Sequence, residues 1–433
     1  MSFLKVLGFD SAKHSVKTEI VAGITTFLTM AYILAVNPDI FGALEGMGMP
    51  KGAVFTATAL AAIVGTLVMS LYAKKPYALA PGLGLNAFFV YTVCLTMGYS
   101  WQFALTAVLI EGIIFIILTV TNVREAIINA IPKSMKSAVS AGIGLFIAFI
   151  GMVNAGIIVD DGGTIISLGT ITSGPALLAI VGLVITSVMM ILKVPGAMLI
   201  GIIVTAVIGI PFGITKFDGV VSSVPSVAPI FWKFEFHNIL SWDMLIVVFT
   251  FLFIDMFDTI GTVIGVSKKA NTMNPDGTIP GVKKVLMADA VATVWGAICG
   301  TSTTTTYVES ASGVAEGGRT GLTSFTVAIC FAIALFFAPV FLAIPSAATA
   351  PALILVGVMM MSSILDVDFN DFSECIPAYI TMIVMPLAYS ISDGIMLGMI
   401  SFVVLNALTG KFKKISVMMW ILAVLFVLRY CLL

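Results

Sequence analysis

The sequence predicts an all-α polytopic membrane protein with about fourteen transmembrane segments. Two observations lead to this fold class. Of the 433 residues, 60% are hydrophobic and only 10% are charged, whereas a soluble domain carries about 25% charged residues. Apolar stretches of about 20 residues, long enough to cross a bilayer, also follow one another along nearly the whole chain.

The segments form two groups of seven, separated by the longest polar interruption. We therefore expect a first seven-span repeat at 1–214, a connector at 215–242 and a second seven-span repeat at 243–410. The first group comprises 18–37, 53–73, 77–97, 101–120, 134–156, 175–193 and 196–214, and the second comprises 243–266, 283–299, 301–317, 322–343, 346–365, 373–392 and 393–410. Because seven is odd, the second repeat is inverted relative to the first. The tail, 411–433, contains a further apolar stretch, which is either an extra crossing or an interfacial helix.

The basic residues set the orientation of the chain. With the N-terminus in the cytoplasm, all of the 21 Lys and Arg residues fall on the cytoplasmic side except Lys51, Lys216, Lys233 and, in the tail, Arg429. Cytoplasmic loops of membrane proteins carry such an excess of Lys and Arg. The pattern therefore predicts a multi-pass protein of the lipid bilayer with a cytoplasmic N-terminus.

Composition also excludes several classes of site. A net charge of −1 gives no support for a nucleic-acid partner. The five cysteines are scattered and form no metal-binding spacing, and the two histidines, His14 and His237, stand far apart. We expect no metal site and no cofactor.

Two of the predicted segments do not resemble ordinary spanning helices. In the tenth, four consecutive threonines, Thr303–Thr306, favour extended backbone. In the third, Pro81 favours extended backbone at Ala80, and Gly82 and Gly84 loosen the chain after it. Extended backbone at membrane depth is tolerated only inside protein or along a cavity. Interrupted segments at corresponding places in two repeats indicate the binding site of a transporter.

Acidic residues lie in or beside these interrupted segments. Glu309 follows the threonine run, and Asp255 and Asp258 share a face of the eighth segment because they are three residues apart. A carboxylate at bilayer depth costs about 3 kcal/mol or more and is treated as functional by default. The alternative is that each carboxyl pairs or caps inside the helix bundle.

Neutralisation of these acids by a buried cation is not expected, since no Lys or Arg lies mid-span in segments eight to ten. Burial without a cation favours the protonated carboxyl. Asp255, Asp258 and Glu309 are therefore candidates for proton coupling. For Glu111 and Asp289, which lie inside segments four and nine, we favour a structural or gating role because neither lies near an interruption in the sequence.

Asn86 is the polar side chain of the third segment, and it offers both a donor and an acceptor. It contacts a substrate or, alternatively, joins helices to one another.

Three motifs carry a resemblance to a known family: APGLGLNAF at 80–88, FIDMFDTIGT at 253–262 and GTSTTTTYVES at 300–310. They resemble the AzgA-like purine permeases of the nucleobase–ascorbate transporter superfamily, and the stretches 9–11 and 29–34 also match. The resemblance implies short antiparallel strands in segments three and ten. It also implies a core domain at roughly 18–120 and 243–343 and a gate domain at roughly 134–214 and 346–410.

The resemblance further implies residue roles. Asp255 would hydrogen-bond the purine ring, Glu309 would bind the opposite part of the base, and Asn86 would be needed for binding or transport. Thr259 stands about where related uracil permeases have a histidine, and the backbone near Tyr307 would donate to the base. The full predicted substrate-binding set is Asp255, Glu309, Asn86, Leu83, Tyr307, Val308, Ser310 and Thr259.

The predicted function is proton-coupled import of purine bases by alternating access, with guanine and hypoxanthine ahead of adenine. The resemblance places the chain in the cytoplasmic membrane of a bacterium, and related proteins form homodimers through the gate domain. Another nucleobase or a small anion is the alternative cargo, although Asp255 and Glu309 would repel an anion. An enzyme is not expected, because the segments offer no histidine or metal cluster at membrane depth.

Overall fold

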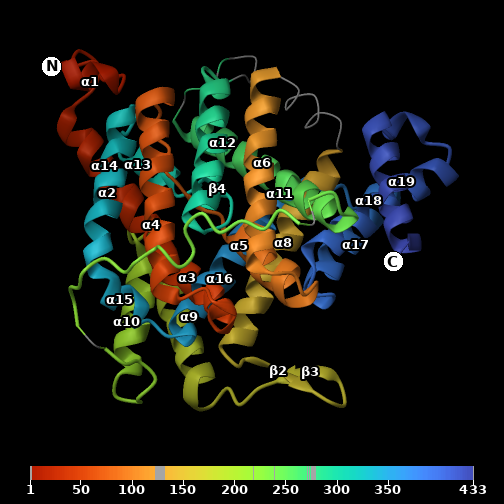
Figure 1. Cartoon of the computed structure of the whole chain (residues 1–433), viewed down its shortest axis with the longest axis horizontal. Helices are drawn as coiled ribbons and strands as arrows, with labels where there is room; N and C mark the ends of the chain where they lie inside the picture. Colours follow the sequence, from red (N-terminus) through yellow and green to blue (C-terminus); the bar gives the residue numbers. More distant parts are fainter. Residues whose placement is uncertain are drawn as a thin grey trace.

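The computed structural model describes residues 2–121, 132–217, 219–237, 239–270, 272, 274 and 279–432. These residues form a bundle of helices that lie roughly side by side (Figure 1). The N-terminus lies at one end of the bundle, and a hairpin of β2 (Ile158–Asp161) and β3 (Ile165–Leu168) projects from the other (Figure 1).

Helices cover most of the predicted segments of both repeats. In the first repeat these are α1 (Ser2–Val6), α2 (Val16–Met30), α3 (Ile33–Phe41), α4 (Lys51–Val68), α5 (Leu83–Ala87), α6 (Trp101–Thr121), α8 (Lys133–Asn154), α9 (Gly174–Ile191) and α10 (Ala197–Gly209). In the second repeat and tail they are α11 (Trp242–Lys269), α12 (Val282–Cys299), α13 (Ser310–Ala315), α14 (Gly321–Ala334), α15 (Ala338–Leu342), α16 (Ser346–Met361), α17 (Phe372–Leu387), α18 (Ile391–Leu408) and α19 (Val417–Leu432). Short 3-10 or π-helical segments extend or join them: η1 (Gly42–Met47), η2 (Met69–Ala73), η3 (Phe88–Thr96), η4 (Leu335–Phe337), η5 (Ser362–Asp366) and η6 (Phe412–Lys414).

Nine helical stretches among the described residues are long and apolar enough to cross a membrane. The third, seventh and thirteenth predicted segments contain shorter apolar helices, and the tenth contains only α13. The third and tenth segments are short in helix because part of each is a strand, β1 (Leu79–Pro81) and β4 (Thr304–Thr306). The all-α class and the two short strands are thus as predicted.

Two features differ from the expectation. The first predicted segment is not one helix, because α2 ends at Met30 and α3 begins at Ile33, which leaves Ala31 and Tyr32 between them. The β2–β3 hairpin was not predicted either. Its sequence carries the signal, since β-branched residues flank Asp161-Gly162-Gly163, a combination typical of hairpin turns.

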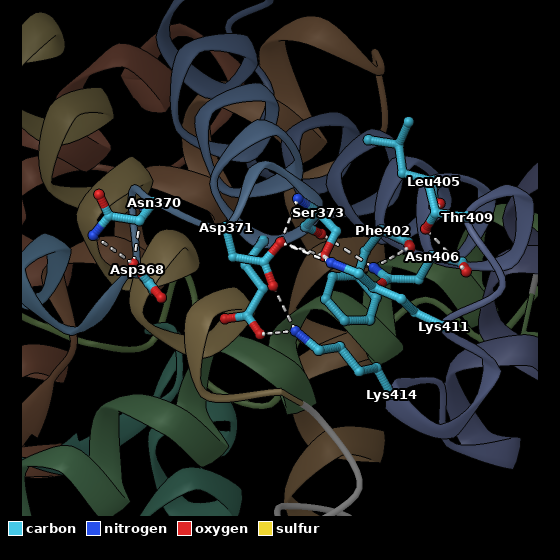
Figure 2. Close-up of polar contacts among 11 residues, drawn as sticks. Asp368, Asn370, Asp371, Ser373, Phe402, Leu405, Asn406, Thr409, Lys411 and Lys414 are labelled. Atoms are coloured by element: carbon cyan, nitrogen blue, oxygen red, sulfur yellow. Dashed lines mark hydrogen bonds and ion pairs between the residues drawn. The ribbon is translucent and has the colours of Figure 1, made fainter.

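The apolar tail packs as a helix alongside α18. Between α18 and α19, Lys411 and Lys414 bind Asp371, the residue before α17, at 3.0 and 2.7 Å, as Figure 2 shows. Near the end of α19, Tyr430 donates to Asp393 in the first turn of α18 at 2.8 Å. The tail helix therefore follows α18 from its last turn to its first, which favours an extra crossing over an interfacial helix.

Removing the Asp371 carboxylate is expected to loosen the start of the tail. Lys414 and then Ser373 and Lys411 hold the pKa of Asp371 below its usual range. The attachment is therefore present at neutral pH and is lost only as pH falls through that lowered pKa. Exposed ion pairs are weak, so Asp371→Asn should speed proteolytic cleavage between 409 and 416 by about two- to fivefold. Asp368→Asn is the control, since Asp368 bonds only Asn370 among the described residues (Figure 2); equal cleavage of both variants would contradict the assignment.

Candidate substrate site

The two interrupted segments meet as a pair of antiparallel strands in the middle of the protein. Ala80 pairs with Thr305, and Pro81 pairs with Thr304. The pairing extends beyond the strands, because Gly82 donates its amide to the carbonyl of Thr303 at 3.0 Å. All six strand residues are buried. Each segment thus satisfies the backbone of the other, which is the condition for extended backbone at membrane depth.

Side chains join the same two segments. Ser302 donates to the side-chain oxygen of Asn86, and the Tyr307 hydroxyl donates to the carbonyl of Pro81. The Ala78 amide donates to the Ser310 hydroxyl at 3.0 Å. Asn86 and Ser310 are fully buried, so in this structure they hold the two interruptions together.

A cavity of about 390 Å³ lies beside the strand pair. Its walls come from the ends of the two strands, the residues between α2 and α3, and the helices α8, α11 and α16. The polar residues of the lining include Tyr32, Ser140, Asp258, Thr262, Thr306, Tyr307, Glu309, Ser362 and Ser363. The exposed lining residues, which include Met359 and Ser362 at the end of α16 and just after it, mark the side on which the cavity opens. The volume falls within the range of small-molecule sites.

Two carboxyl groups face this cavity, those of Glu309 and Asp258. Tyr32 donates its hydroxyl to Glu309 Oε1 at 2.6 Å, which fixes the orientation of that carboxyl. Donors are provided by the backbone, since the amides of Leu83 and Val308, both in the lining, have no acceptor within the described residues. The site therefore combines the carboxyl acceptors Glu309 and Asp258 with amide donors at the two interruptions.

A second polar layer lies behind the cavity. The Thr259 hydroxyl is 3.0 Å from Asp255 Oδ1, 3.1 Å from Asp289 Oδ2 and 2.7 Å from the Thr305 hydroxyl. Asp289 Oδ1 in turn accepts the Thr306 amide at 3.1 Å. Asp255, Thr259 and Asp289 are fully buried. This layer connects α11 and α12 to the strand β4.

The structure corrects one premise about the remaining acids. Glu111 and Asp289 are distant in sequence from the interruptions, yet both contact the threonine run. Glu111 accepts a hydrogen bond from the Thr303 hydroxyl, and Asp289 accepts from the amide and hydroxyl of Thr306. They lie beside the interruption because α12 packs against β4 and α6 packs against α12.

The predicted binding residues thus separate into two groups. Leu83, Tyr307, Val308 and Glu309 line the cavity, whereas Asp255, Thr259, Asn86 and Ser310 lie behind its wall. Asp258, predicted for proton coupling and favoured less than Asp255 for substrate contact, lines the cavity in the place expected for Asp255. The backbone amides of Tyr307 and Ser310 are also used within the protein, by the carbonyls of Ala78 and Tyr307.

Sequence analysis missed Tyr32, Ser140 and Thr262 as cavity residues. Tyr32 lies in the stretch 29–34 that matched the purine permeases, and Thr262 closes the motif at 253–262. The position of Tyr32 and Thr262 in these motifs could have indicated that they belong to the site. Ser140 gave no signal in the sequence.

Close packing against β4 depends on a glycine of α12. A Cβ added to Gly296 would lie 2.4 Å from Thr304 Oγ1 and 3.0 Å from the Ser302 carbonyl oxygen. Gly296→Ala should therefore displace β4 and destabilise the protein by about 1–3 kcal/mol. The measurement is the apparent Tm in detergent, with Gly46→Ala as control because a Cβ there meets open space. An unchanged Tm for Gly296→Ala would show that β4 can move at little cost.

Inward-facing carboxyls beside two paired helix interruptions, within a bundle of membrane-crossing helices, define a membrane transporter. Residues 17–397 match the model of the Permease family, and the chain belongs to this family. It is 45% identical to the guanine/hypoxanthine permease PbuG of Bacillus subtilis, over 98% of each chain. It is 40% identical to the adenine permease AdeQ of Escherichia coli, over 96% of this chain and 93% of that one.

Among solved structures, the transmembrane domain of the cyanobacterial bicarbonate transporter BicA has the same fold. It covers 88% of this chain and 97% of its own, with a TM-score of 0.64 and 16% identity. Together with the family match, this confirms the predicted fold class and the resemblance to purine permeases. The protein is a transporter and not an enzyme.

Proposed function

We propose that this protein imports purine nucleobases together with protons by alternating access, guanine and hypoxanthine before adenine. The observation that carries the proposal is the pair of carboxyls, Glu309 and Asp258, in one cavity with free backbone donors. A purine base is flat and neutral and has N–H donors beside ring acceptors. Carboxylates accept from the ring N–H groups, and the amides of Leu83 and Val308 donate to ring nitrogen or carbonyl oxygen. The names of PbuG and AdeQ support the same class of cargo.

Of Asp255 and Asp258 on α11, Asp258 is the one placed to contact a base in this cavity. Asp255 acts through Thr259, whose hydroxyl also lies 2.7 Å from Thr305 in β4. Asn86 acts in a similar way, through Ser302 and Pro81. We therefore propose that Asp255, Thr259, Asn86 and Ser310 support binding by holding the interruptions in register.

The alternative cargoes fit this site less well. A small anion, as carried by the transporter of similar fold, would meet two carboxyl groups and no basic side chain in the described cavity lining. Another nucleobase could use the same kinds of donors and acceptors as a purine. The arrangement of the donors in the site decides which base is bound. A test of cargo must therefore include a pyrimidine and an anion.

The placement of the cavity between the two proposed domains supports alternating access. Lining residues come from the proposed core domain, 18–120 and 243–343, and from the proposed gate domain, 134–214 and 346–410. The core domain contributes the interruptions, Asp258 and Glu309, whereas the gate domain contributes a mostly apolar wall with Val356 and Met359. Sliding of the core along this wall would carry the base without breaking polar contacts to it. The homodimer through the gate domain stays a prediction.

Proton coupling is supported by the layer behind the cavity. One Thr259 hydroxyl hydrogen lies within bonding distance of both Asp255 and Asp289. The sequence from 285 to 318 and from 234 to 267 contains no Lys or Arg that could neutralise these acids. A proton on either acid would let that carboxyl donate to the Thr259 oxygen while the Thr259 hydroxyl donates to the other acid.

The test is uptake of radiolabelled hypoxanthine by the purified protein in lipid vesicles. Excess guanine and adenine should compete, whereas uracil and sulfate should not. An inward proton gradient should raise accumulation. Competition by sulfate would overturn the cargo, and indifference to the gradient would overturn the coupling. Location in a bacterial cytoplasmic membrane with the N-terminus inside is part of the proposal, and the basic loops support it.

A further inference from the structure

Asp39, at the end of α3, joins two parts of the protein that the cavity separates. Its Oδ1 accepts from the Ser346 hydroxyl and its Oδ2 accepts from the Thr349 hydroxyl, each at 2.7 Å. Both donors belong to the first turns of α16, in the proposed gate domain. The Asp39 side chain is only 5% exposed, so both carboxylate oxygens are committed to α16 in a nearly dry contact.

Asn37, two positions before Asp39, attaches α3 to the proposed core domain. Asn37 donates to the Thr58 hydroxyl of α4 at 2.7 Å and to the Thr301 hydroxyl at 3.1 Å. Thr301 lies just before β4, and Asn37 is fully buried. The stretch Asn37-Pro38-Asp39 thus binds the core through its asparagine and α16 through its aspartate.

α16 carries this contact at one end and the cavity at the other. Met359 and Met360 line the cavity, and exposed Ser362 lies at its opening. Ten residues of helix, about 15 Å, separate Thr349 from Met359. Asp39 therefore closes the protein at the end away from the cavity opening.

A second contact lies at the same closed end. Asn154, the last residue of α8, donates to the Tyr91 hydroxyl of η3 at 3.0 Å. The Tyr91 ring also packs edge-on against Tyr389, with ring centroids 5.9 Å apart. Tyr91 belongs to the proposed core domain, whereas Asn154 and Tyr389 belong to the proposed gate domain. The opposite half of α8 lines the cavity through Val139 and Ile143.

We propose that the contact of Asp39 with Ser346 and Thr349, here named the Asp39 latch, holds the far side of the transporter shut while the cavity is open. It must break when the core moves and the far side opens. Lys51 Nζ, 3.6 Å from Asp39 Oδ1, belongs to α4 and moves with the core. It compensates the Asp39 charge when the hydroxyls of α16 leave. The inference rests on the proposed alternating access but on no particular cargo.

The test measures opening of the far side directly, without any base. Ala352 lies on α16 between Thr349 and the cavity residue Val356 and is 1% exposed. In a protein whose five native cysteines are replaced by alanine, Ala352→Cys is alkylated by a membrane-impermeant thiol reagent added on the β2–β3 side. The rate reports the population that is open on that side.

Asp39→Ala, and separately Ser346→Ala with Thr349→Val, should raise the alkylation rate about tenfold, because hydrogen bonds to a charged group are lost. Thr349→Ser keeps the hydroxyl and should leave the rate nearly unchanged. A buried reporter within the gate, Ala179→Cys, distinguishes opening from unfolding, since Ala179 is fully buried. Unchanged labelling of Ala352→Cys in both latch variants would overturn the proposal. A parallel rise at Ala179→Cys would also overturn it, because Asp39 would then only stabilise the fold.

Discussion

Glu309→Ala is expected to reduce hypoxanthine uptake at least about 100-fold while leaving the protein inserted in the membrane. The Glu309 carboxyl lines the cavity, and Tyr32 occupies one of its oxygens at 2.6 Å. The other oxygen remains to accept from a base. Removing the carboxyl leaves the ring N–H of the base without its acceptor in the cavity, which costs more than the loss of a solvated hydrogen bond. The measurement is initial uptake in vesicles, normalised to the amount of inserted protein.

The same segment provides the control. Glu316 lies seven residues further on, is exposed and does not line the cavity, so Glu316→Ala should transport nearly normally. Tyr32→Phe removes only the hydroxyl that orients Glu309 and should lower uptake less, about tenfold. Near-normal uptake by Glu309→Ala would remove Glu309 from the site, and equal losses in Glu309→Ala and Glu316→Ala would assign the effect to folding.

The two interruptions were predictable because their residues dictate the backbone locally. Pro81 lacks an amide hydrogen and restricts Ala80, and four successive β-branched threonines disfavour helix. These effects act within a few residues, so the sequence alone predicts extended backbone at both places, and the resemblance to the purine permeases adds that the two stretches are antiparallel strands. Even the need for a partner follows, since extended backbone in a membrane must be satisfied by protein. The observed pair of Leu79–Pro81 with Thr304–Thr306 has this origin.

The choice between Asp255 and Asp258 was not predictable in the same way. Residues three apart on a helix differ by about 60° around its axis, so they share a face only approximately. A small rotation of α11 decides which carboxyl faces the cavity and which faces β4. That rotation is set by packing against α6, α8 and α13, which no local pattern records. The structure turns Asp258 to the cavity and Asp255 to Thr259.

The contacts of Tyr32, Glu111 and Asp289 were likewise not predictable from local sequence patterns. Each contacts a residue of the tenth segment that is 17 or more positions away in sequence: Glu309, Thr303 and Thr306 respectively. Distance along the chain suggested that the last two acids were remote from the site. Helix packing brings them beside it, and only the folded arrangement of α3, α6 and α12 contains that information.

Asp258→Asn is expected to weaken the binding of guanine or hypoxanthine about 100-fold, and more than Asp255→Asn does. Asp258 lines the cavity and would accept a ring N–H, whereas Asp255 bonds Thr259, whose hydroxyl contacts Thr305 of β4. The asparagine keeps the shape of the side chain but replaces one acceptor oxygen with a donor, which a ring N–H cannot use. Equilibrium binding to the purified protein gives the Kd, and the apparent Tm shows whether the fold is retained.

The comparison of the two Kd values is informative because Asp258→Asn and Asp255→Asn each remove one carboxylate from the same helix at nearly the same depth. Asp243→Asn is the control on α11, since Asp243 bonds Tyr99 in the helix's first turn, far from the cavity. Its Kd should equal that of the unaltered protein. If Asp255→Asn loses affinity while Asp258→Asn retains it, the base is bound by the inner layer of Asp255, Thr259 and Asp289. The cavity beside Glu309 would then be a passage to the site rather than the site itself.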